Sequence, residues 1–437
     1  WSSLRAQKGP PGWASSSSIP ASERRHSTMP AECTTPADVP APADGRAPAD
    51  GRLLAVSLMG RRYLESMTTE STSRVPPTDV LPDDVLTIGV LGAAKISGPA
   101  LLQPALDTEG VRVAAIASRD RDRAQDQADE FGIDEVVDSY DAVLASDVDA
   151  IYNPLPINLH HEWTLAALAA GKHVLCEKPF ASNTEQAQEM VEAATAAGLT
   201  LVEAFHWRYH PLTARIAERL SDVGEIRHID AAFTVEISPQ DDVRQSFELS
   251  GGALMDLGCY PAQWIRFAGR GLGGDSTTSA EPVVTAATMV EGRPNVDITT
   301  DIDLRFDTGA TAHLHTAMHP GCGLSAFLEV AGDRGVLRVD NPIAPHRGHQ
   351  LTFRPAGSEP GGAGEEKETV EAKTTYHHQL EGFRDAVVDG VDPDGVVDRQ
   401  RVDGFEPIIQ GVDFLVNFLD ERLATDRVEG PIERSHE

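Results

Sequence analysis

The chain contains little lysine and few aromatic side chains. Lysine accounts for only six of its 37 basic residues, and Phe, Trp and Tyr together make up 5% of its 437 residues. Its 68 acidic side chains outnumber the basic ones, so the formal net charge at pH 7 is −31. A field of this sign repels nucleic acid and anionic membranes, and we expect neither as a partner.

The negative charge is confined to the larger part of the chain. Residues 1–84 hold 9 basic and 10 acidic side chains, which leaves 28 basic and 58 acidic side chains for residues 85–437. An acidic surface that is poor in lysine suits a halophilic protein, because salt screens much of the self-repulsion. A source proteome that is merely acidic and prefers arginine is the alternative interpretation.

Paired cysteines and long apolar runs are also absent from the sequence. Cys33, Cys176, Cys259 and Cys322 lie too far apart along the chain for a zinc motif or a disulfide framework. We therefore expect no metal, and we expect a reducing compartment such as the cytoplasm. No apolar run approaches the roughly 20 residues that span a bilayer, and we expect no signal peptide.

The first 84 residues differ in composition from the rest of the chain. Residues 1–84 are rich in Ser, Pro, Ala and Thr and show no periodicity, so we predict a disordered extension. Over residues 85–206, strand-like apolar runs alternate with helical segments. This alternation predicts an α/β fold whose first domain is a Rossmann-type, doubly wound parallel sheet.

Residues 207–437 have another pattern. Long β-rich runs occur with few helices between them, which predicts a second, α+β domain with a large, mostly antiparallel open sheet. Residues 357–368 are rich in Gly and Glu and are expected to form a loop. Apolar residues at helical spacing predict amphipathic helices near the end of the chain, at 377–388 and 406–423.

A small-residue turn comes after the first predicted strand. Gly92 is placed for a tight turn, and Ala93, Ala94, Ile96 and Ser97 lead into a helix. Small residues at these positions allow the backbone to approach the pyrophosphate of a dinucleotide. The match to the glycine-rich fingerprint is degenerate, and a generic strand-to-helix turn is the alternative.

The end of the second predicted strand indicates which dinucleotide is bound. An acidic residue there would bind the ribose 2′-hydroxyl of NAD, but this chain has Ser118 and Arg119, with Arg123 one turn later. A hydroxyl and guanidinium groups suit a 2′-phosphate, so we predict NADP, with NAD as a possible substitute. Asp120 and Asp122 lie nearby and could pair with the arginines instead.

The predicted catalytic residues come from two separate segments. Lys178 precedes a proline at the end of an apolar strand, so it should lie at the carboxyl edge of the sheet, where ligands bind. If residues 253–265 are helical, Asp256 and Tyr260 share one face. A nearby lysine and an oxidised nicotinamide would lower the pKa of Tyr260 and let it take a proton from a substrate hydroxyl. A core tyrosine beside a capping aspartate is the alternative.

Several short motifs occur in a fixed order. They are Gly92–Ile96, Ser118-Arg119, Pro154-Leu155-Pro156 with Asn158-Leu159-His160, Cys176-Glu177-Lys178-Pro179, Glu203-Ala204-Phe205 with Arg208-Tyr209-His210-Pro211, and Gly251–Tyr260. Together they resemble the Gfo/Idh/MocA oxidoreductases, in particular the branch with glucose–fructose oxidoreductase, dimeric dihydrodiol dehydrogenase and NADP-dependent D-xylose 1-dehydrogenase. The resemblance covers about residues 85–430.

This resemblance implies specific roles for the matching residues. It implies that Lys178 is the catalytic lysine, Tyr260 the acid/base group and Asp256 their partner. It also implies a homo-oligomer, a dimer or tetramer, that forms through the sheet of the second domain. We expect these residues to bind the cofactor: Gly92, Ala93, Ala94, Ile96, Ser118, Arg119, Arg123, Pro154, Leu155, His160, Glu177, Lys178, Arg208 and Tyr376.

The expected activity is NADP-dependent oxidation of a sugar or cyclic polyol. An aldose such as D-xylose or D-glucose, oxidised at C1 to the lactone, is the first hypothesis. The rivals are a trans-dihydrodiol dehydrogenase, a glucose–fructose-type enzyme that retains its nucleotide, and a non-catalytic dinucleotide-sensing regulator. His206-Trp207 stands where relatives commonly carry Met-Tyr, which would reshape the substrate pocket. His160, His161 and His210 could contact ligand, but a structural role is favoured for each.

Overall fold

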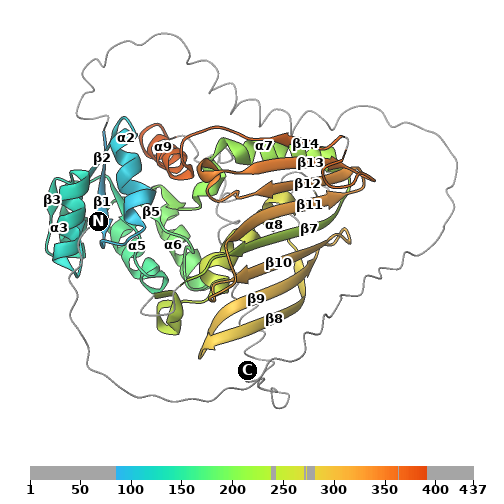
Figure 1. Cartoon of the computed structure of the whole chain (residues 1–437). Coiled ribbons are helices and arrows are strands. Elements are labelled where there is room, and N and C mark those ends of the chain that lie inside the picture. Colours follow the sequence, from blue (N-terminus) through green and yellow to red (C-terminus); the bar gives the residue numbers. More distant parts are fainter. Residues whose placement is uncertain (1–84, 238–242, 270–271, 273–280, 363, 391–437) are drawn as a thin grey trace, which may run out of the picture. The chain divides into compact units, whose positions relative to one another are not determined.

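A computed structural model of the chain describes residues 85–237, 243–269, 272, 281–362 and 364–390 (Figure 1). The disorder expected over residues 1–84 and the helix expected over 406–423 lie outside these residues. Two β-sheets organise the described part of the chain, one parallel and one mostly antiparallel. The predicted α/β fold class is thereby confirmed.

The first sheet has six parallel strands. They are β1 (Leu86–Leu91), β2 (Val111–Ala117), β3 (Glu135–Val136), β4 (Ala150–Asn153), β5 (His173–Cys176) and β6 (Leu201–Glu203). Their order is β3-β2-β1-β4-β5-β6. Strand order therefore reverses between β1 and β4, and ligands bind beyond the carboxyl ends of the strands at such a switch point.

Helices connect these strands, and polar side chains fix where the helices begin. The helical elements are η2 (Gly98–Leu102), α2 (Gln103–Asp107), α3 (Arg121–Phe131), α4 (Tyr140–Ala145), η3 (Ile157–Leu159), α5 (His160–Ala169) and α6 (Thr184–Ala197). Asp120, Ser139 and Asn183 each accept a hydrogen bond from a main-chain N–H at the start of α3, α4 and α6. Gly132 and Gly198 end α3 and α6 in the left-handed conformation.

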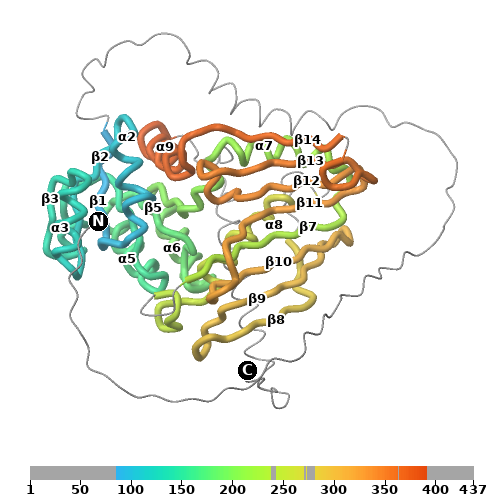
Figure 2. The backbone as a smooth tube through the Cα atoms, in the orientation of Figure 1, coloured from blue at the N-terminus to red at the C-terminus, as the bar shows by residue number. Residues whose placement is uncertain are grey.

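The second sheet has eight strands. They are β7 (Ile226–Thr234), β8 (Val283–Arg293), β9 (Val296–Arg305), β10 (Thr311–Ala317), β11 (Ser325–Gly332), β12 (Gly335–Asp340), β13 (Gln350–Pro355) and β14 (Glu366–Glu368). Their order is β14-β13-β12-β11-β7-β10-β9-β8, with β7 and β10 parallel and the other neighbours antiparallel. Figure 2 shows β7 between β11 and β10, although two strands separate β7 from β10 in sequence.

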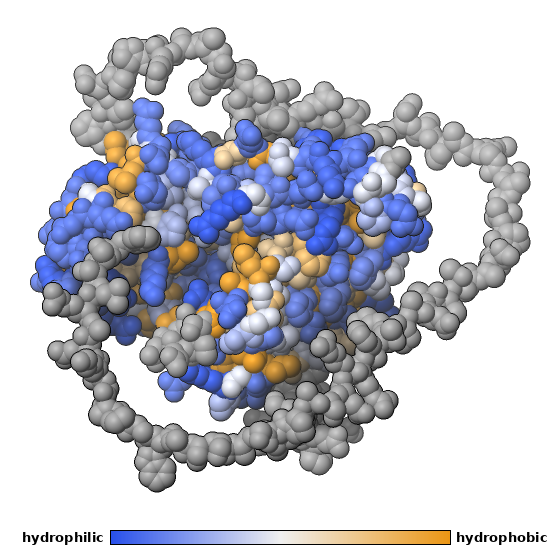
Figure 3. All heavy atoms as spheres, in the orientation of Figure 1, coloured by the Kyte–Doolittle hydropathy of each residue, from blue (hydrophilic) through white to orange (hydrophobic). Residues whose placement is uncertain are grey.

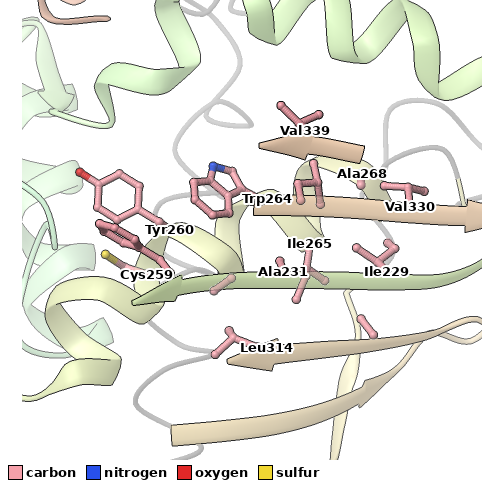
Figure 4. Close-up of a cluster of buried hydrophobic side chains, with 14 of the residues drawn as sticks. Ile229, Ala231, Cys259, Tyr260, Trp264, Ile265, Ala268, Leu314, Val330 and Val339 are labelled. Carbon is pink, nitrogen blue, oxygen red and sulfur yellow. The ribbon is translucent and has the colours of Figure 1, made fainter. Parts of the chain in front are cut away.

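Short helical elements lead into this sheet, and α8 packs against it. They are η4 (His206–Tyr209), α7 (Pro211–Leu220), η5 (Ser221–Val223), η6 (Val243–Gln245), η7 (Phe247–Leu249), η8 (Leu254–Gly258), α8 (Cys259–Gly269) and, after β12, η10 (Pro345–Arg347). Figure 4 shows Trp264 and Ile265 of α8 beside Ile229, Leu314 and Val330 from three strands. This apolar packing fixes the position of α8. It therefore also fixes the residues of η8, which come directly before α8.

The sequence did not predict three features of this region. β13 was not predicted, and β14 lies in the segment we expected to be a loop, because it is short and charged and is recognisable only by its pairing with β13. The helix expected over 253–265 begins as a π-helical turn, η8, before α8 continues it. The helical turn between Asp256 and Tyr260 is therefore wider than the α-helical turn that the expected i, i+4 spacing assumes.

The last described helix, α9 (Thr375–Val388), packs against the first sheet. Leu380 and Phe383 are fully buried, in the same core cluster as Ile88 of β1 and Leu101 of η2. Gly382 lies against the ring of Tyr209 in η4, where a Cβ would come within 2.8 Å of that ring. This helix follows the second sheet in sequence, while its apolar face packs in the core cluster of the first sheet.

Candidate functional site

The turn after β1 brings the ends of two strands together. Gly92 has a φ of +89°, a left-handed conformation that glycine adopts without strain. A Cβ atom at this position would lie 3.1 Å from Cδ2 of Leu155, which comes after β4. Glycine is therefore favoured at the point where strand order reverses, which is the position at which dinucleotides bind in sheets of this order.

The rest of this turn presents a buried hydroxyl group. Ser97 is fully buried, and its Oγ has no hydrogen-bond partner among the described residues. Ala93 is buried, Ala94 is half-buried and Ile96 is exposed. Small residues, a positive-φ glycine and an unpaired hydroxyl fit the pyrophosphate of a dinucleotide, which requires close backbone approach and polar contacts.

The residues expected at the adenosine ribose lie after β2. Arg123 donates to Asp120, with 3.3 Å between Nη2 and Oδ2. The alternative that the sequence left open for this arginine, pairing with a nearby aspartate, is therefore the one observed. Ser118 accepts a hydrogen bond at Oγ from the N–H of Asp120, at 3.2 Å. Burial raises the pKa of Tyr140, and the neighbouring Arg119 guanidinium opposes that rise. Arg119 therefore has a hydrogen-bond partner without charge, the hydroxyl of Tyr140, whereas Arg123 is paired with a carboxylate.

His160 is enclosed by main-chain oxygens. Its Nδ1 lies 2.9 Å from the carbonyl oxygen of Pro179, and its Nε2 lies 2.7 Å from that of Leu155. The residue is 1% exposed, and burial lowers its pKa to about 4. His160 therefore joins the loop after β4 to the turn after β5. Both of its ring nitrogens contact main-chain oxygens, so neither is left for the cofactor contact that we expected.

His161 and His210 also have structural partners. His161 Nε2 lies 2.6 Å from Oε2 of Glu189 in α6. His210 accepts a hydrogen bond at Nδ1 from the N–H of Leu212, at 3.1 Å, and so caps α7. The favoured structural interpretation of these histidines agrees with the observed contacts.

Glu177 and Pro154 are buried at the strand ends. Glu177 accepts a hydrogen bond from the hydroxyl of Tyr152 at 2.8 Å, and burial raises its pKa. Pro154 is buried directly after β4. Burial also raises the pKa of Glu203, at the end of β6, to about 8, and Arg208 of η4 opposes that rise. Two carboxyl groups that resist ionisation therefore lie beside the carboxyl edge of the sheet.

Lys178 lies just after β5 and is bound by Asp256. Its Nζ donates to Oδ1 of Asp256 at 2.9 Å and to the main-chain oxygen of the same residue at 2.8 Å. The two side chains are only 13% and 10% exposed. Burial opposes the charge of Lys178, but the Asp256 carboxylate outweighs it and raises the pKa of the ammonium group. Lys178 is thus a fixed cation at the edge of the first sheet.

A second cation, which the sequence did not indicate, binds the other oxygen of Asp256. Arg244 donates from Nε to Oδ2 of Asp256 at 2.6 Å. Burial alone would raise the pKa of Asp256, but Lys178 and Arg244 together lower it to about 2. One carboxylate therefore neutralises part of the charge of two cations.

Tyr260 lies beside this ion cluster. Its ring centre is 5.3 Å from Nζ of Lys178, and the residue is 3% exposed. Burial raises its pKa well above the ordinary value of a phenol. In the protein alone, burial of the phenol is the dominant effect on this pKa. The expected lowering requires the oxidised nicotinamide as well as Lys178 and stays a prediction. Figure 4 shows the hydroxyl of Tyr260 turned away from the packed face of α8.

His206 was noted in the sequence only as a departure from relatives. In the structure its Nε2 lies 3.1 Å from the hydroxyl oxygen of Tyr260, and its ring centre lies 4.1 Å from that of Tyr376, tilted by 38°. Burial raises the pKa of Tyr376. Tyr376, which we expected near the cofactor, therefore lies in the same site as Tyr260, and His206 contacts both tyrosines.

The remaining expectations concern metals and membranes. No group of three or more His, Cys, Asp or Glu side chains among the described residues is arranged to hold a metal ion. Within the same residues, none of the helices is both long and apolar enough to cross a bilayer.

Comparison with protein-family models matches the two parts of the chain in order. The Gfo/Idh/MocA model, described as an oxidoreductase family with an NAD-binding Rossmann fold, matches residues 86–205. The model of the Gfo/Idh/MocA C-terminal domain matches residues 212–338.

Individual proteins resemble the chain over most of the described residues. An NADP-dependent D-xylose 1-dehydrogenase from Haloferax volcanii is 34% identical over 324 residues, 72% of this chain and 93% of its own length. A dTDP-3,4-didehydro-2,6-dideoxy-α-D-glucose 3-reductase from Actinomadura kijaniata is 45% identical over 194 residues, 44% of this chain and 57% of its own. A crystal structure of a 3-ketoreductase from that organism, with NADP and TDP-benzene, has a TM-score of 0.67 and 30% identity, and covers 76% of this chain and 96% of its own.

Proposed function

Because this chain belongs to the Gfo/Idh/MocA family and is therefore an NAD(P)-dependent oxidoreductase, we propose that it oxidises an uncharged aldose with NADP. The substrate would be a pentose or hexose such as D-xylose or D-glucose, oxidised at C1 to the lactone. The observation that carries this proposal is the buried pair of Lys178 and Asp256 beside the hydroxyl-bearing ring of Tyr260.

The residues around the first sheet fit the dinucleotide. Gly92 and Ser97 would hold the pyrophosphate, and Arg119 with Ser118 would bind the 2′-phosphate that distinguishes NADP from NAD. When bound, the nicotinamide supplies the hydride acceptor for oxidation and the hydride donor for reduction. The preference for NADP also agrees with the cofactor in the name of the Haloferax volcanii relative.

Lys178 and Tyr260 act on the substrate hydroxyl. Lys178 is held charged, so it can donate a hydrogen bond to the hydroxyl oxygen and stabilise negative charge that develops there. Tyr260 receives the hydroxyl proton in oxidation and returns it in reduction. Asp256 fixes the position of Lys178 and does not itself exchange protons, because its pKa of about 2 keeps it ionised.

The charge balance of the site favours an uncharged substrate. The positive charges of Lys178 and Arg244 are both paired with the carboxylate of Asp256, so less positive charge remains to attract an anionic ligand. A second candidate is a nucleotide-linked sugar, because a 194-residue segment is 45% identical to a reductase of a dTDP-linked sugar. A diphosphate would need further cations close to the substrate, in a part of the chain whose formal charge is strongly negative.

The test is a substrate panel with both nucleotides. We would follow reduction of NADP and NAD with D-xylose, D-glucose, other aldoses, a cyclic polyol and a trans-dihydrodiol, and oxidation of NADPH with a dTDP-linked 3-keto sugar. Turnover of an aldose with release of its lactone supports the proposal. Turnover of the dihydrodiol or the dTDP-linked sugar alone would replace it with that activity, and nucleotide binding without any turnover would favour a retained cofactor or a regulator.

Two further expectations belong to the same proposal. We infer a homo-oligomer that forms through the second sheet, on whose outer face His313 is paired with Asp303 and Arg338 with Asp340. We also infer a reducing, cytoplasmic setting, which agrees with the three unpaired cysteines among the described residues. Light scattering of the purified chain would test the first inference.

A further inference from the structure

His206 connects the hydroxyl of Tyr260 to the first turn of α9. Its Nε2 lies 3.1 Å from Oη of Tyr260, and its Nδ1 lies 2.7 Å from Oγ1 of Thr375. His206 is 3% exposed, and Thr375 is fully buried. Three hydroxyl and imidazole groups from η4, α8 and α9 therefore form one buried chain of hydrogen bonds.

The groups that face His206 hold it neutral and oriented. Burial, together with the charges of Lys178 and His346, lowers its pKa to about 3. The ring of Tyr376 stacks on the imidazole, so the ring cannot easily rotate. A neutral imidazole has one donor nitrogen and one acceptor nitrogen. A proton on Nδ1, donated to Thr375, would leave the lone pair of Nε2 facing Tyr260.

Tyr260 needs such a partner in the direction of oxidation. Burial raises the pKa of its phenol, so a free phenolate is not available at neutral pH to take the substrate proton. A phenol can accept one proton only if it passes on the one it already carries. Within the described residues, the imidazole of His206 is the group hydrogen-bonded to that hydroxyl.

We propose that His206 is a positioning residue that receives the proton of Tyr260 through Nε2 while Tyr260 takes the hydroxyl proton of the substrate. This inference rests on the oxidoreductase function proposed above. The carbon–hydrogen bond of the substrate breaks with its electron pair, which leaves as hydride to the oxidised nicotinamide. The oxygen–hydrogen bond also breaks, its electrons form the carbonyl π bond, and its proton joins Oη of Tyr260. The former Tyr260 proton passes to Nε2, and His206 becomes an imidazolium that donates to Tyr260 and Thr375. Because burial and the charge of Lys178 disfavour this cation, it exists only until the proton is passed on.

The same arrangement gives α9 a role in the site. In the proposed tautomer Thr375 accepts from Nδ1 of His206, and the ring of Tyr376 lies against the imidazole. The relay operates in either direction, because an imidazolium can return its proton to Tyr260 when a carbonyl is reduced. After oxidation, Tyr260 and His206 release the extra proton to water once the product has left.

The first test uses nitrogen NMR of the histidine side chains in the full-length protein without nucleotide or substrate. We would identify His206 from its absence in His206→Gln. We expect a neutral ring with its proton on Nδ1 between about pH 5 and pH 8, and an Nε2 signal that moves in Tyr260→Phe. A proton on Nε2 instead would mean that His206 donates to Tyr260, and would overturn the relay whatever the substrate proves to be.

The second test measures turnover of the substrate found with the panel. His206→Gln keeps polar contacts but cannot take up a proton, so we expect kcat to fall roughly 100-fold with little change in KM. The solvent isotope effect on kcat in deuterium oxide should also change, which a purely structural role would not cause. His161→Gln, at a remote histidine paired with Glu189, is the matched control and should keep wild-type kcat. A His206→Gln variant with wild-type kcat and isotope effect would refute the proposal.

Discussion

Asp256 holds Lys178 with two oxygen atoms, one from its side chain at 2.9 Å and one from its main chain at 2.8 Å. The second contact comes from the π-helical turn η8, which directs the main-chain oxygen of Asp256 toward the first sheet. Lys178, at the edge of the first sheet, is therefore fixed by the main chain of η8, which comes directly before α8, the helix that carries Tyr260. Asp256 thus fixes Lys178 at a point four residues before Tyr260 in the chain.

Replacing Asp256 by asparagine should destabilise the protein and reduce activity together. Asp256→Asn leaves the buried charge of Lys178 and the charge of Arg244 without their carboxylate, and breaking a buried pair in this way costs about 3–5 kcal/mol. Urea unfolding measures the loss. Asp303→Asn removes an exposed partner of His313 and should cost less than about 1 kcal/mol. Equal losses in the two variants would contradict the role of Asp256.

Replacing Arg119 should affect NADP far more than NAD. Arg119→Ala should raise KM for NADP by roughly tenfold or more, since it removes a charge-assisted contact with the 2′-phosphate. The KM for NAD should hardly change. Arg123→Ala is the matched control and should have a smaller effect, because Asp120 already binds that guanidinium. Equal effects of Arg119→Ala on the two nucleotides would remove Arg119 from the 2′-phosphate site.

Glu203 should make stability fall as the pH rises. Burial raises its pKa from 4.5 to about 8, so the folded protein binds a proton that the unfolded chain releases between these values. The stabilisation is fully present below pH 4.5 and is lost as the pH passes through 8. Glu203→Gln cannot ionise but can still accept from the N–H of Phe180. Its unfolding free energy should vary less over this window than that of the wild type, and an identical pH dependence would contradict this assignment.

Salt should stabilise the protein if its acidic surface is an adaptation to high salt. Figure 3 shows hydrophilic side chains over most of the face in view, and residues 85–437 carry 58 acidic against 28 basic side chains. The Debye length falls from about 10 Å at ~0.1 M to about 3 Å at ~1 M salt, which weakens repulsion among these charges. We expect the melting temperature and kcat to rise toward molar sodium chloride. An equal concentration of an uncharged osmolyte is the control, and a fall of both quantities with salt would support the merely acidic proteome.

Much of the site could be predicted because its residues lie at ends of recognisable elements. Pro179 marks the end of β5 and places Lys178 at the carboxyl edge of the sheet. Gly92 lies between a buried apolar strand and a helix, so its turn was predictable from local sequence. Parallel strands bring such ends together whatever their separation in the chain.

Other residues of the site depend on contacts that no local pattern records. Arg244 lies in a short 3-10 helix, η6, and only the tertiary fold brings it to Asp256. Thr375 reaches His206 across 169 positions of sequence, because α9 packs on the first sheet and not on the second. The burial that raises the pKa of Tyr260 could not be predicted either, since the depth of burial of a side chain cannot be deduced from its spacing to a lysine.

The most direct test of the account is to compare wild-type protein and Tyr260→Phe on the substrate that the panel identifies. We expect the substitution to lower kcat by about 10²- to 10⁴-fold while the dissociation constant of NADP stays within about twofold, since the phenol transfers protons and does not bind the nucleotide. An unchanged kcat would show that another group exchanges the substrate proton, and would contradict the assignment of Lys178 and Tyr260 as the catalytic pair.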